Sequence, residues 1–211
     1  MLIVHFYDMD KGAELVKAAR SSIELYIKSP SFYKGIVSSN LLHFKDKYGI
    51  FVTIEHYPTR TLRGCIGFLY GSSYVYHTVV DAAIAAAFED PRFVPISHYE
   101  LDEILIEVNV LSEMRNLGKT AATRKRNLVL GRDGISMEYG IYRGLLLPSV
   151  AIEENLTKEE FLNALCDKAG LPSRYWMQPN VKMQCFETQI FREERPNGRI
   201  IDVDLKQMIK I

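Results

Sequence analysis

Short segments in which every second residue is apolar restrict the fold of this chain more than any other feature. The clearest is GIFVTIEHY, where Ile50, Val52 and Ile54 lie on one side of an extended backbone. Three further runs have strand-like patterns: residues 104–110, 135–147 and 183–194. Glycine or proline turns follow several of these runs, which is typical of antiparallel hairpins. The pattern therefore predicts a mainly antiparallel sheet with one buried face.

Helical spacing occupies the longer segments between the predicted strands. From Asp10, a predicted N-cap, apolar residues recur at helical spacing as far as Ile27. Further along, Thr157 and Glu160 form a capping box for a helix that ends before Gly170. Helices inserted in blocks among hairpin strands favour an α+β fold over a doubly wound one. A chain of 211 residues, 47% hydrophobic, can bury one substantial core or a main core with a smaller lobe.

The chain carries no net charge, because 26 basic residues balance 26 acidic ones. Proteins dedicated to nucleic acids usually carry a basic surplus, since phosphate neutralisation supplies much of their affinity. We therefore expect that nucleic acid is not the main partner. One basic cluster could meet phosphate, although the charge pattern favours a solvated loop: Lys119, Arg124, Lys125, Arg126 and Arg132.

The three cysteines, Cys65, Cys166 and Cys185, are widely spaced and form no CxxC pair. This spacing argues against a disulfide framework and a zinc knuckle. No histidine pair has metal-ligand spacing and no phosphate-binding glycine loop is present, so the sequence indicates no metal and leaves the cofactor unknown. The N-terminus lacks an export leader and no segment reads as a membrane span. We therefore expect a soluble, cytoplasmic protein with reduced thiols.

The stretch TLRGCIGFLY combines an arginine and a thiol on the returning arm of the first predicted hairpin. Strand alternation predicts a core-facing set: Leu62, Ile66 and Phe68. Thr61, Arg63 and Cys65 then share the opposite face. Gly64 and Gly67 leave room for a ligand or another backbone to come close.

Two interpretations of Cys65 follow from its neighbours. In the functional one, the Arg63 guanidinium favours the thiolate and lowers the thiol pKa from about 8.5, which makes Cys65 a nucleophile. In the structural one, Cys65 is a buried small side chain in a bulged strand, and Arg63 pairs with a structural carboxylate. The residues alone leave both open.

A second polar constellation is EDPRF, in which Asp90 and Arg92 flank a proline just after a predicted helix. This stiff segment can present a carboxylate and a guanidinium in fixed directions, either to a polar substrate or to Arg63. The structural alternative is an ordinary helix stop with a local ion pair. On the preceding helix, His77 and Asp81 are predicted to form a solvated pair.

Six motifs, in this order along the chain, resemble the AMMECR domain family: LRGCIG at 62–67, DPRF at 90–93, EVNVLS at 107–112, GRDGI at 131–135, LLPSVA at 146–151 and KAGL at 168–171. The resemblance spans about residues 10–195, and LRGCIG is its most specific motif. Four residues depart from the usual family pattern: Val94, Asn109, Ser149 and Leu156. Asn109, Val94 and Ser149 could alter a wall of the site, but Arg63, Cys65, Asp90 and Arg92 are intact.

The resemblance implies a single AMMECR-type domain over residues 1–211, with a larger lobe, a smaller lobe and a cleft between them that gathers the signature residues. In prokaryotes, members of this family are often encoded beside a memo-like protein and a radical SAM enzyme, within an AmmeMemoRadiSam system. These two proteins are therefore the partners that the resemblance implies. It assigns no reaction.

Two functional hypotheses remain. In the first, the chain binds or acts on a small anionic metabolite, with Cys65 as the catalytic residue. The predicted ligand-binding residues are Arg63, Gly64, Gly67, Asp90 and Arg92. In the second, the chain is an interaction module that docks a memo-like or radical SAM partner, or an RNA, without catalysis of its own. Compact glycines beside a polar strand face favour the first hypothesis.

Overall fold

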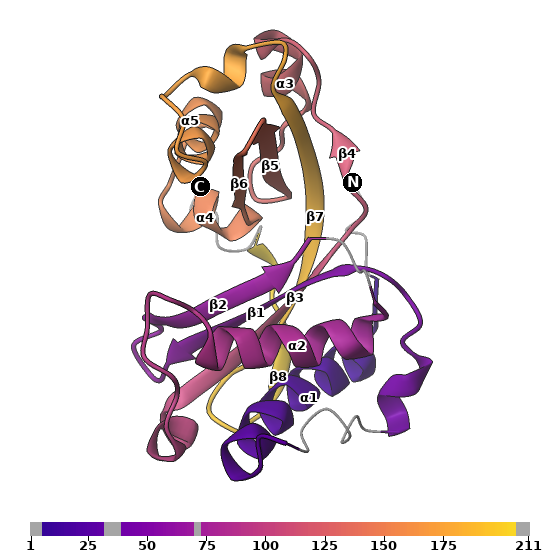
Figure 1. The fold of residues 1–211 in the computed structure, drawn as a ribbon. Coiled ribbons are helices and arrows are strands. Elements are labelled where there is room, and N and C mark those ends of the chain that lie inside the picture. The colour runs from indigo at the N-terminus through magenta and orange to yellow at the C-terminus, as the bar shows by residue number, and fades with distance from the viewer. Residues whose placement is uncertain (1–5, 32–38, 70–72, 206–211) are drawn as a thin grey trace. The chain divides into compact units, whose positions relative to one another are not determined.

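The computed structural model describes residues 6–31, 39–69 and 73–205, which form the predicted α+β fold (Figure 1). The chain divides into two compact units. Unit 1 contains Met1–Leu111 and Gln189–Val203, and unit 2 contains Ser112–Thr188 and Asp204–Ile211. The strand β7, Lys182–Glu193, begins in unit 2 and ends in unit 1. The cleft that the family resemblance implies between two lobes stays a prediction.

Unit 1 is built from three neighbouring strands and two long helices, with short additional elements: α1 Met9–Lys28, η2 Ser39–His43, β1 Gly49–His56, β2 Leu62–Phe68, α2 Val75–Phe88, η3 His98–Glu103, β3 Ile104–Leu111 and β8 Ile200–Asp202. β1 pairs antiparallel with both β2 and β3, so it is the central strand of the three. Asp8, not Asp10, caps α1, because its side chain accepts a hydrogen bond from the Lys11 N–H.

The core of unit 1 lies between this part of the sheet and the helices α1 and α2. Ile50, Val52 and Ile54 of β1 are fully buried in it, as their spacing predicts. The alternate residues of the same strands therefore lie on the opposite side of the sheet, which we call the second face. Thr53 of β1 and Glu107 of β3 belong to the second face and are directly paired in register.

A bulge changes the direction of side chains in β2. Ile54 pairs with Gly64, but the next residue of β1, Glu55, pairs with Leu62. Arg63 is therefore an extra residue of β2, and the regular alternation is interrupted there.

The bulge explains one error in the alternation predicted for β2. Ile66 packs against the core as predicted, but Leu62 and Phe68 are 41% and 42% exposed. The prediction that Leu62 faces the core is therefore wrong, whereas Phe68 pairs with core-facing Ile50 as predicted but is not buried. Leu62 pairs with a residue of the second face because of the bulge, and Phe68 is the last residue of a strand that has only β1 as its neighbour in the described chain.

A buried ion pair ties the first helix of unit 1 to the sheet. Arg20 of α1 donates to both carboxylate oxygens of Glu193 in β7, over 2.6 Å each. Its guanidinium also donates to the backbone carbonyls of Leu101 and Ile104. Glu193 in turn accepts the backbone N–H of Ile106 at 3.0 Å. Both charges are thus almost fully enclosed and satisfied by hydrogen bonds.

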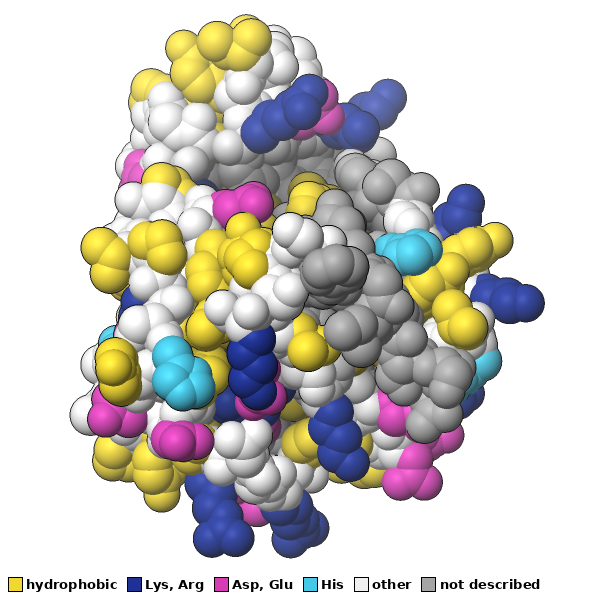
Figure 2. All heavy atoms as spheres, turned by 60° about the horizontal axis from the view of Figure 1, so that its bottom comes forward, with side chains coloured by type: hydrophobic (Ala, Val, Ile, Leu, Met, Phe, Trp, Pro, Cys, Tyr) yellow, Lys and Arg dark blue, Asp and Glu magenta, His cyan; other side chains and the backbone are white. Residues whose placement is uncertain are grey.

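Charged side chains of both signs are interspersed on the face shown in Figure 2. Within residues 6–31, 39–69 and 73–205, no helix is long and apolar enough to cross a membrane.

The described part of unit 2 contains three α-helices, one 3-10 helix and three strands besides the first part of β7: β4 Arg115–Asn116, α3 Ala121–Asn127, β5 Asp133–Tyr139, β6 Tyr142–Leu146, α4 Pro148–Glu153, α5 Lys158–Lys168 and η4 Tyr175–Met177. β5 pairs with β6 and with β7, as the two predicted strand segments require. The Thr157–Glu160 capping box begins α5, and Gly170 with φ of 75° follows its end, as predicted.

Arg124 organises the loops of unit 2 from the inside. Its side chain is fully buried and donates to four backbone carbonyls: those of Gly118, Trp176, Gln178 and Val181. Burial lowers the pKa of this guanidinium. Arg124 therefore does not belong to a solvated basic loop.

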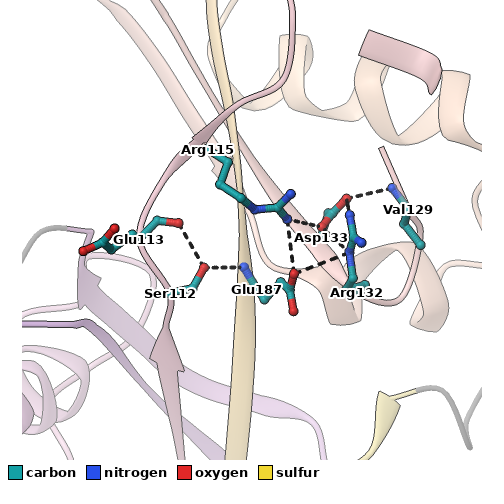
Figure 3. A network of polar contacts seen from close by, with 7 residues as sticks. All are labelled: Ser112, Glu113, Arg115, Val129, Arg132, Asp133 and Glu187. Atoms are coloured by element: carbon teal, nitrogen blue, oxygen red, sulfur yellow. Dashed lines mark hydrogen bonds and ion pairs between the residues drawn. The ribbon is translucent and has the colours of Figure 1, made fainter. Parts of the chain in front are cut away.

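A second polar network in unit 2 occupies the turn before β5 (Figure 3). Asp133 is fully buried and accepts from Arg132, Arg115 and the backbone N–H of Val129. Glu187 of β7 lies 3.3 Å from Arg115. Two arginines and two carboxylates thus balance within one network. Arg132 is engaged here, so the predicted basic cluster does not form a single phosphate-facing patch.

Candidate functional site

The segment after α2 closes over the outer side of β2. Asp90, only 4% exposed, accepts the backbone N–H of Cys65 at 2.9 Å. Arg92 donates to the backbone carbonyl of Cys65 over 3.3 Å. The two side chains together satisfy both backbone groups that Cys65 directs away from β1. The DPRF segment therefore holds the signature strand at its thiol-bearing residue.

Asp90 and Arg92 also form a bidentate pair with each other. The Arg92 Nε and Nη2 atoms lie 2.9 and 2.7 Å from the two carboxylate oxygens. These hydrogen bonds hold the pKa of Asp90 well below its usual range and raise the pKa of Arg92. The Arg92 side chain nevertheless remains 47% exposed. Asp90 and the Cys65 carbonyl thus hold the guanidinium, while the side chain as a whole is about half exposed. The local ion pair predicted as the structural alternative is present.

Cys65 lies on the second face beside Thr53, with 3.4 Å between Sγ and Oγ1. Burial raises the pKa of the Cys65 thiol, and the contact with Thr53 and the charge of Arg92 oppose this only in part. The prediction that Arg63 lowers the pKa of Cys65 is therefore wrong. Arg92 supplies the favourable charge, and the thiol is the resting form at neutral pH.

Arg63 is directed towards η3 rather than towards the thiol. Its Nε donates to Glu100 at 2.8 Å, and the side chain is 6% exposed. Burial favours the neutral form of Glu100, but hydrogen bonds from Arg63 and Ser97 outweigh it and lower the pKa of the carboxyl. Arg63 therefore pairs with a carboxylate, as the structural interpretation of this strand predicts, and that carboxylate belongs to Glu100. Phe93 lies beneath both guanidiniums, 5.9 Å from that of Arg63 and 5.4 Å from that of Arg92.

The two glycines of the signature make room for other parts of unit 1. A Cβ on Gly64 would lie 2.2 Å from the backbone oxygen of Ala86 in α2. A Cβ on Gly67 would lie 2.3 Å from the ring of Phe51 in β1. The sequence left two uses for these glycines, room for a ligand or room for other protein atoms. The structure shows protein atoms close to both glycines.

Sequence reasoning missed a row of polar residues on the second face. Cys65, Thr53 and Glu107 occupy paired positions on β2, β1 and β3. Asn109, two residues along β3 and 1% exposed, donates to Glu107 at 2.9 Å. Arg192 of β7 lies 3.6 Å from the same carboxylate. The signal was present in EVNVLS, where polar residues alternate with core valines, but only pairing shows that they align with Cys65.

Two atoms of this row are buried without a hydrogen-bond partner in the described part of the chain. They are Oδ1 of Asn109, an acceptor, and Nε of Arg192, a donor. Buried polar atoms in folded proteins are nearly always paired with protein groups or with ordered water. Nη1 of Arg63, the bulged residue of β2, is a further atom of this kind.

The remaining polar candidates are not part of this site. His77 is exposed on α2, as predicted for a solvated position. In the ranges that the structure describes, no group of three or more His, Cys, Asp or Glu is arranged to hold a metal ion. The other two cysteines, Cys166 and Cys185, are buried at 0% and 2% exposure.

Alkylation rates provide a direct check of the Cys65 environment. Cys65 is expected to react first of the three thiols because it is the least buried, but with a pH midpoint above the value of about 8.5 for free cysteine. Arg92→Ala should move the midpoint to higher pH, and Glu107→Gln should move it to lower pH, because their charges act in opposite directions. Iodoacetamide labelling followed by mass spectrometry between pH 6 and 11 measures this. A midpoint below that of free cysteine contradicts the burial argument.

Comparison with known proteins gives matches over most of the chain. The sequence profile of the AMMECR1 family matches residues 16–191. A protein from Methanococcus aeolicus is 40% identical over 194 residues, 92% of this chain and 96% of its own. One from Methanocaldococcus jannaschii is 39% identical over 199 residues, with 93% and 97% covered. The crystal structure of an uncharacterized protein from Pyrococcus horikoshii superposes with a TM-score of 0.86 at 38% identity, covering 92% of this chain and 97% of its own.

Proposed function

The chain belongs to the AMMECR1 family, and we propose that it binds and acts on a small metabolite at a site formed by Cys65, Asp90 and Arg92. One observation carries this proposal. Asp90 fixes the Arg92 guanidinium against the backbone of the half-buried Cys65, yet the Arg92 side chain remains 47% exposed. Such a group is suited to an anionic or carbonyl oxygen of a ligand, because its direction is set before the ligand arrives.

The charges of the described residues define what kind of anion fits. Asp90 offsets Arg92 and Glu100 offsets Arg63, so the two arginines do not leave a large positive surplus. A ligand with a single carboxylate or phosphate therefore matches this site better than a polyanion. We leave Arg63, Gly64 and Gly67 out of the ligand contacts, because protein groups already occupy their surroundings.

Cys65 is the proposed reacting group. In its resting thiol form it can donate a hydrogen bond to the ligand. To act as a nucleophile, Cys65 first gives its proton to solvent, and the thiolate, which can accept a hydrogen bond from Thr53 at 3.4 Å, then adds its electron pair to an electrophilic carbon of the ligand. The reduced thiol that this requires accords with the cytoplasmic location expected from the sequence.

A second candidate function rests on exposed apolar side chains near β2. Leu62 and Phe68 of β2 are more than two-fifths exposed, and Tyr99 of η3 is 89% exposed. Leu62 and Phe68 are at the two ends of β2, and large exposed apolar side chains can serve as contacts for a partner. The alternative is therefore an interaction module for a memo-like protein, a radical SAM enzyme or an RNA. The zero net charge of the chain favours a protein over an RNA.

A thermal-shift experiment distinguishes the two candidates. Millimolar phosphate, acetate and longer carboxylates are expected to raise the melting temperature of the wild type. A ligand present at a hundred times its Kd stabilises the folded protein by about 2.7 kcal/mol. Arg92→Ala should lose most of this response, and Arg92→Lys should lose part of it because an ammonium lacks the planar fork.

Arg143→Ala is the matched control, because Arg143 is 75% exposed and forms only a surface ion pair. It should respond as the wild type does. If no anion stabilises the wild type, or if Arg92→Ala responds like the control, the interaction module becomes the leading function.

A further inference from the structure

Thr53 carries a hydroxyl at a position of β1 where valine would fill nearly the same space. The residue is 9% exposed, and its neighbours along the strand, Val52 and Ile54, belong to the core. Valine has the branched shape of threonine without the oxygen, and a buried hydroxyl costs free energy unless it is hydrogen-bonded. The hydroxyl of Thr53 therefore requires a partner in the folded protein.

That partner is the thiol of Cys65. Oγ1 of Thr53 lies 3.4 Å from Sγ of Cys65, and the two residues are paired directly across β1 and β2. Within residues 6–31, 39–69 and 73–205, this is the hydrogen bond that the Thr53 hydroxyl makes. A β-branched side chain is stiff at χ1, so the oxygen is held towards the sulfur.

This hydrogen bond stabilises a thiolate more than it stabilises a thiol. The sulfur of a thiol is a weak donor and a weak acceptor, whereas hydrogen bonds to an ionised group are roughly twice as strong as neutral ones. Once the proton of Cys65 has left, the O–H of Thr53 can turn towards the sulfur and donate to it. Thr53 keeps its own proton throughout, so no covalent bond changes at this residue.

The charged groups that surround Cys65 do not by themselves favour its ionised form. Burial raises the pKa of the thiol, and the charges of Glu107 in β3 and of Asp90 after α2 raise it further. The hydrogen bond with Thr53 is the larger of the two effects that lower this pKa, ahead of the charge of Arg92. A neutral donor is thus the main group that opposes the cost of burying a charged sulfur.

We propose that Thr53 is a catalytic residue of this site: its hydroxyl donates to Sγ of Cys65 after the thiol proton has left to solvent, and it sets how much of the nucleophile forms. This inference rests on the proposed function, because it takes Cys65 as the reacting group. It adds the residue that controls the reactivity of that group, and it assigns Thr53 to reactivity rather than to stability.

Thr53→Val tests both parts of the proposal on the full chain. Iodoacetamide labelling of Cys65 across a range of pH, followed by mass spectrometry, should give a midpoint about one pH unit above that of the wild type. At a pH below both midpoints, labelling should therefore be about tenfold slower. The midpoint of urea unfolding should stay the same or rise, because valine fills the same space without a buried polar atom. A threonine with only a structural role would give the reverse, a lower stability and an unchanged labelling midpoint.

Three further variants locate the effect in the hydroxyl. Thr53→Ser keeps the oxygen and should restore most of the wild-type labelling midpoint. Thr53→Ala also removes the oxygen, and it replaces the valine variant if that variant does not fold. Thr78→Val is the matched control, because Thr78 is a buried threonine of α2 whose hydroxyl donates to the Tyr74 carbonyl rather than to a thiol. Its labelling midpoint should equal that of the wild type.

The outcomes separate this inference from the proposed function. If removal of the Thr53 hydroxyl leaves the labelling midpoint unchanged, or if Thr78→Val shifts it equally, the role of Thr53 is overturned. The site proposal then stands as long as anions stabilise the wild type through Arg92. If Cys65 of the folded wild type is labelled at no pH, its thiolate does not react with a small electrophile. The role of Thr53 and the catalytic part of the proposed function are then both overturned.

Discussion

Replacing Arg20 with alanine is expected to lower the free energy of unfolding by about 3–5 kcal/mol. The change leaves the Glu193 carboxylate buried at 3% exposure without its cation, and it leaves the carbonyls of Leu101 and Ile104 without a donor. Both costs arise only in the folded protein, because water solvates these groups in the unfolded chain. Urea unfolding followed by circular dichroism measures the loss.

Lys17→Ala is the matched control on the same helix. Lys17 is exposed in α1, so its removal should change stability by less than about 0.5 kcal/mol. A loss of less than about 1 kcal/mol in Arg20→Ala would show that the ion pair contributes no more than a surface pair.

Leu165→Ala is expected to cost about 2–5 kcal/mol in unit 2. Leu165 is a residue of α5 and is fully buried in a cluster that includes Phe161, Leu162 and Trp176. The cost combines lost apolar burial with a cavity that the surrounding side chains fill only partly. A shift of the unfolding midpoint in urea measures it.

The control at this position is Leu165→Met, which conserves volume and should cost less than about 1.5 kcal/mol. An unchanged midpoint in Leu165→Ala would mean that α5 is not packed on this cluster.

The elements that carry a strong local pattern could be predicted from the sequence. Ile50, Val52 and Ile54 repeat at every second residue, and Thr157 with Glu160 forms a complete capping box, so both elements are found where they are expected. In each case the information lies within a few residues of the chain. The family resemblance was carried by equally local motifs.

The partners of the site residues could not be predicted in this way. Glu100 lies 37 residues from Arg63, and nothing in the local sequence of either indicates the pair. The sequence pattern does not indicate the bulge at Arg63 either. One inserted residue exchanges the two faces of the strand beyond it, and this leaves no mark in the amino-acid composition of the segment. The direction of the side chains in LRGCIG thus depends on strand pairing and on contacts with distant residues, which the local sequence does not contain.

The row on the second face was hidden for a related reason. Each polar residue of EVNVLS is unremarkable within its own strand, since half-exposed strands alternate polar and apolar positions. Only the register that pairs Glu107 with Thr53, and Thr53 with Cys65, shows that they align.

The clamp that Asp90 and Arg92 form on Cys65 also has a consequence for solubility and for partners. An outermost strand normally presents unpaired N–H and C=O groups that can recruit a strand from another molecule, the route to aggregation. At Cys65, side chains already occupy both groups. An incoming peptide could not add in register along β2 without first dislodging an Asp–Arg pair. The same two residues that orient a guanidinium for a ligand therefore protect this molecule from self-association through β-strand addition.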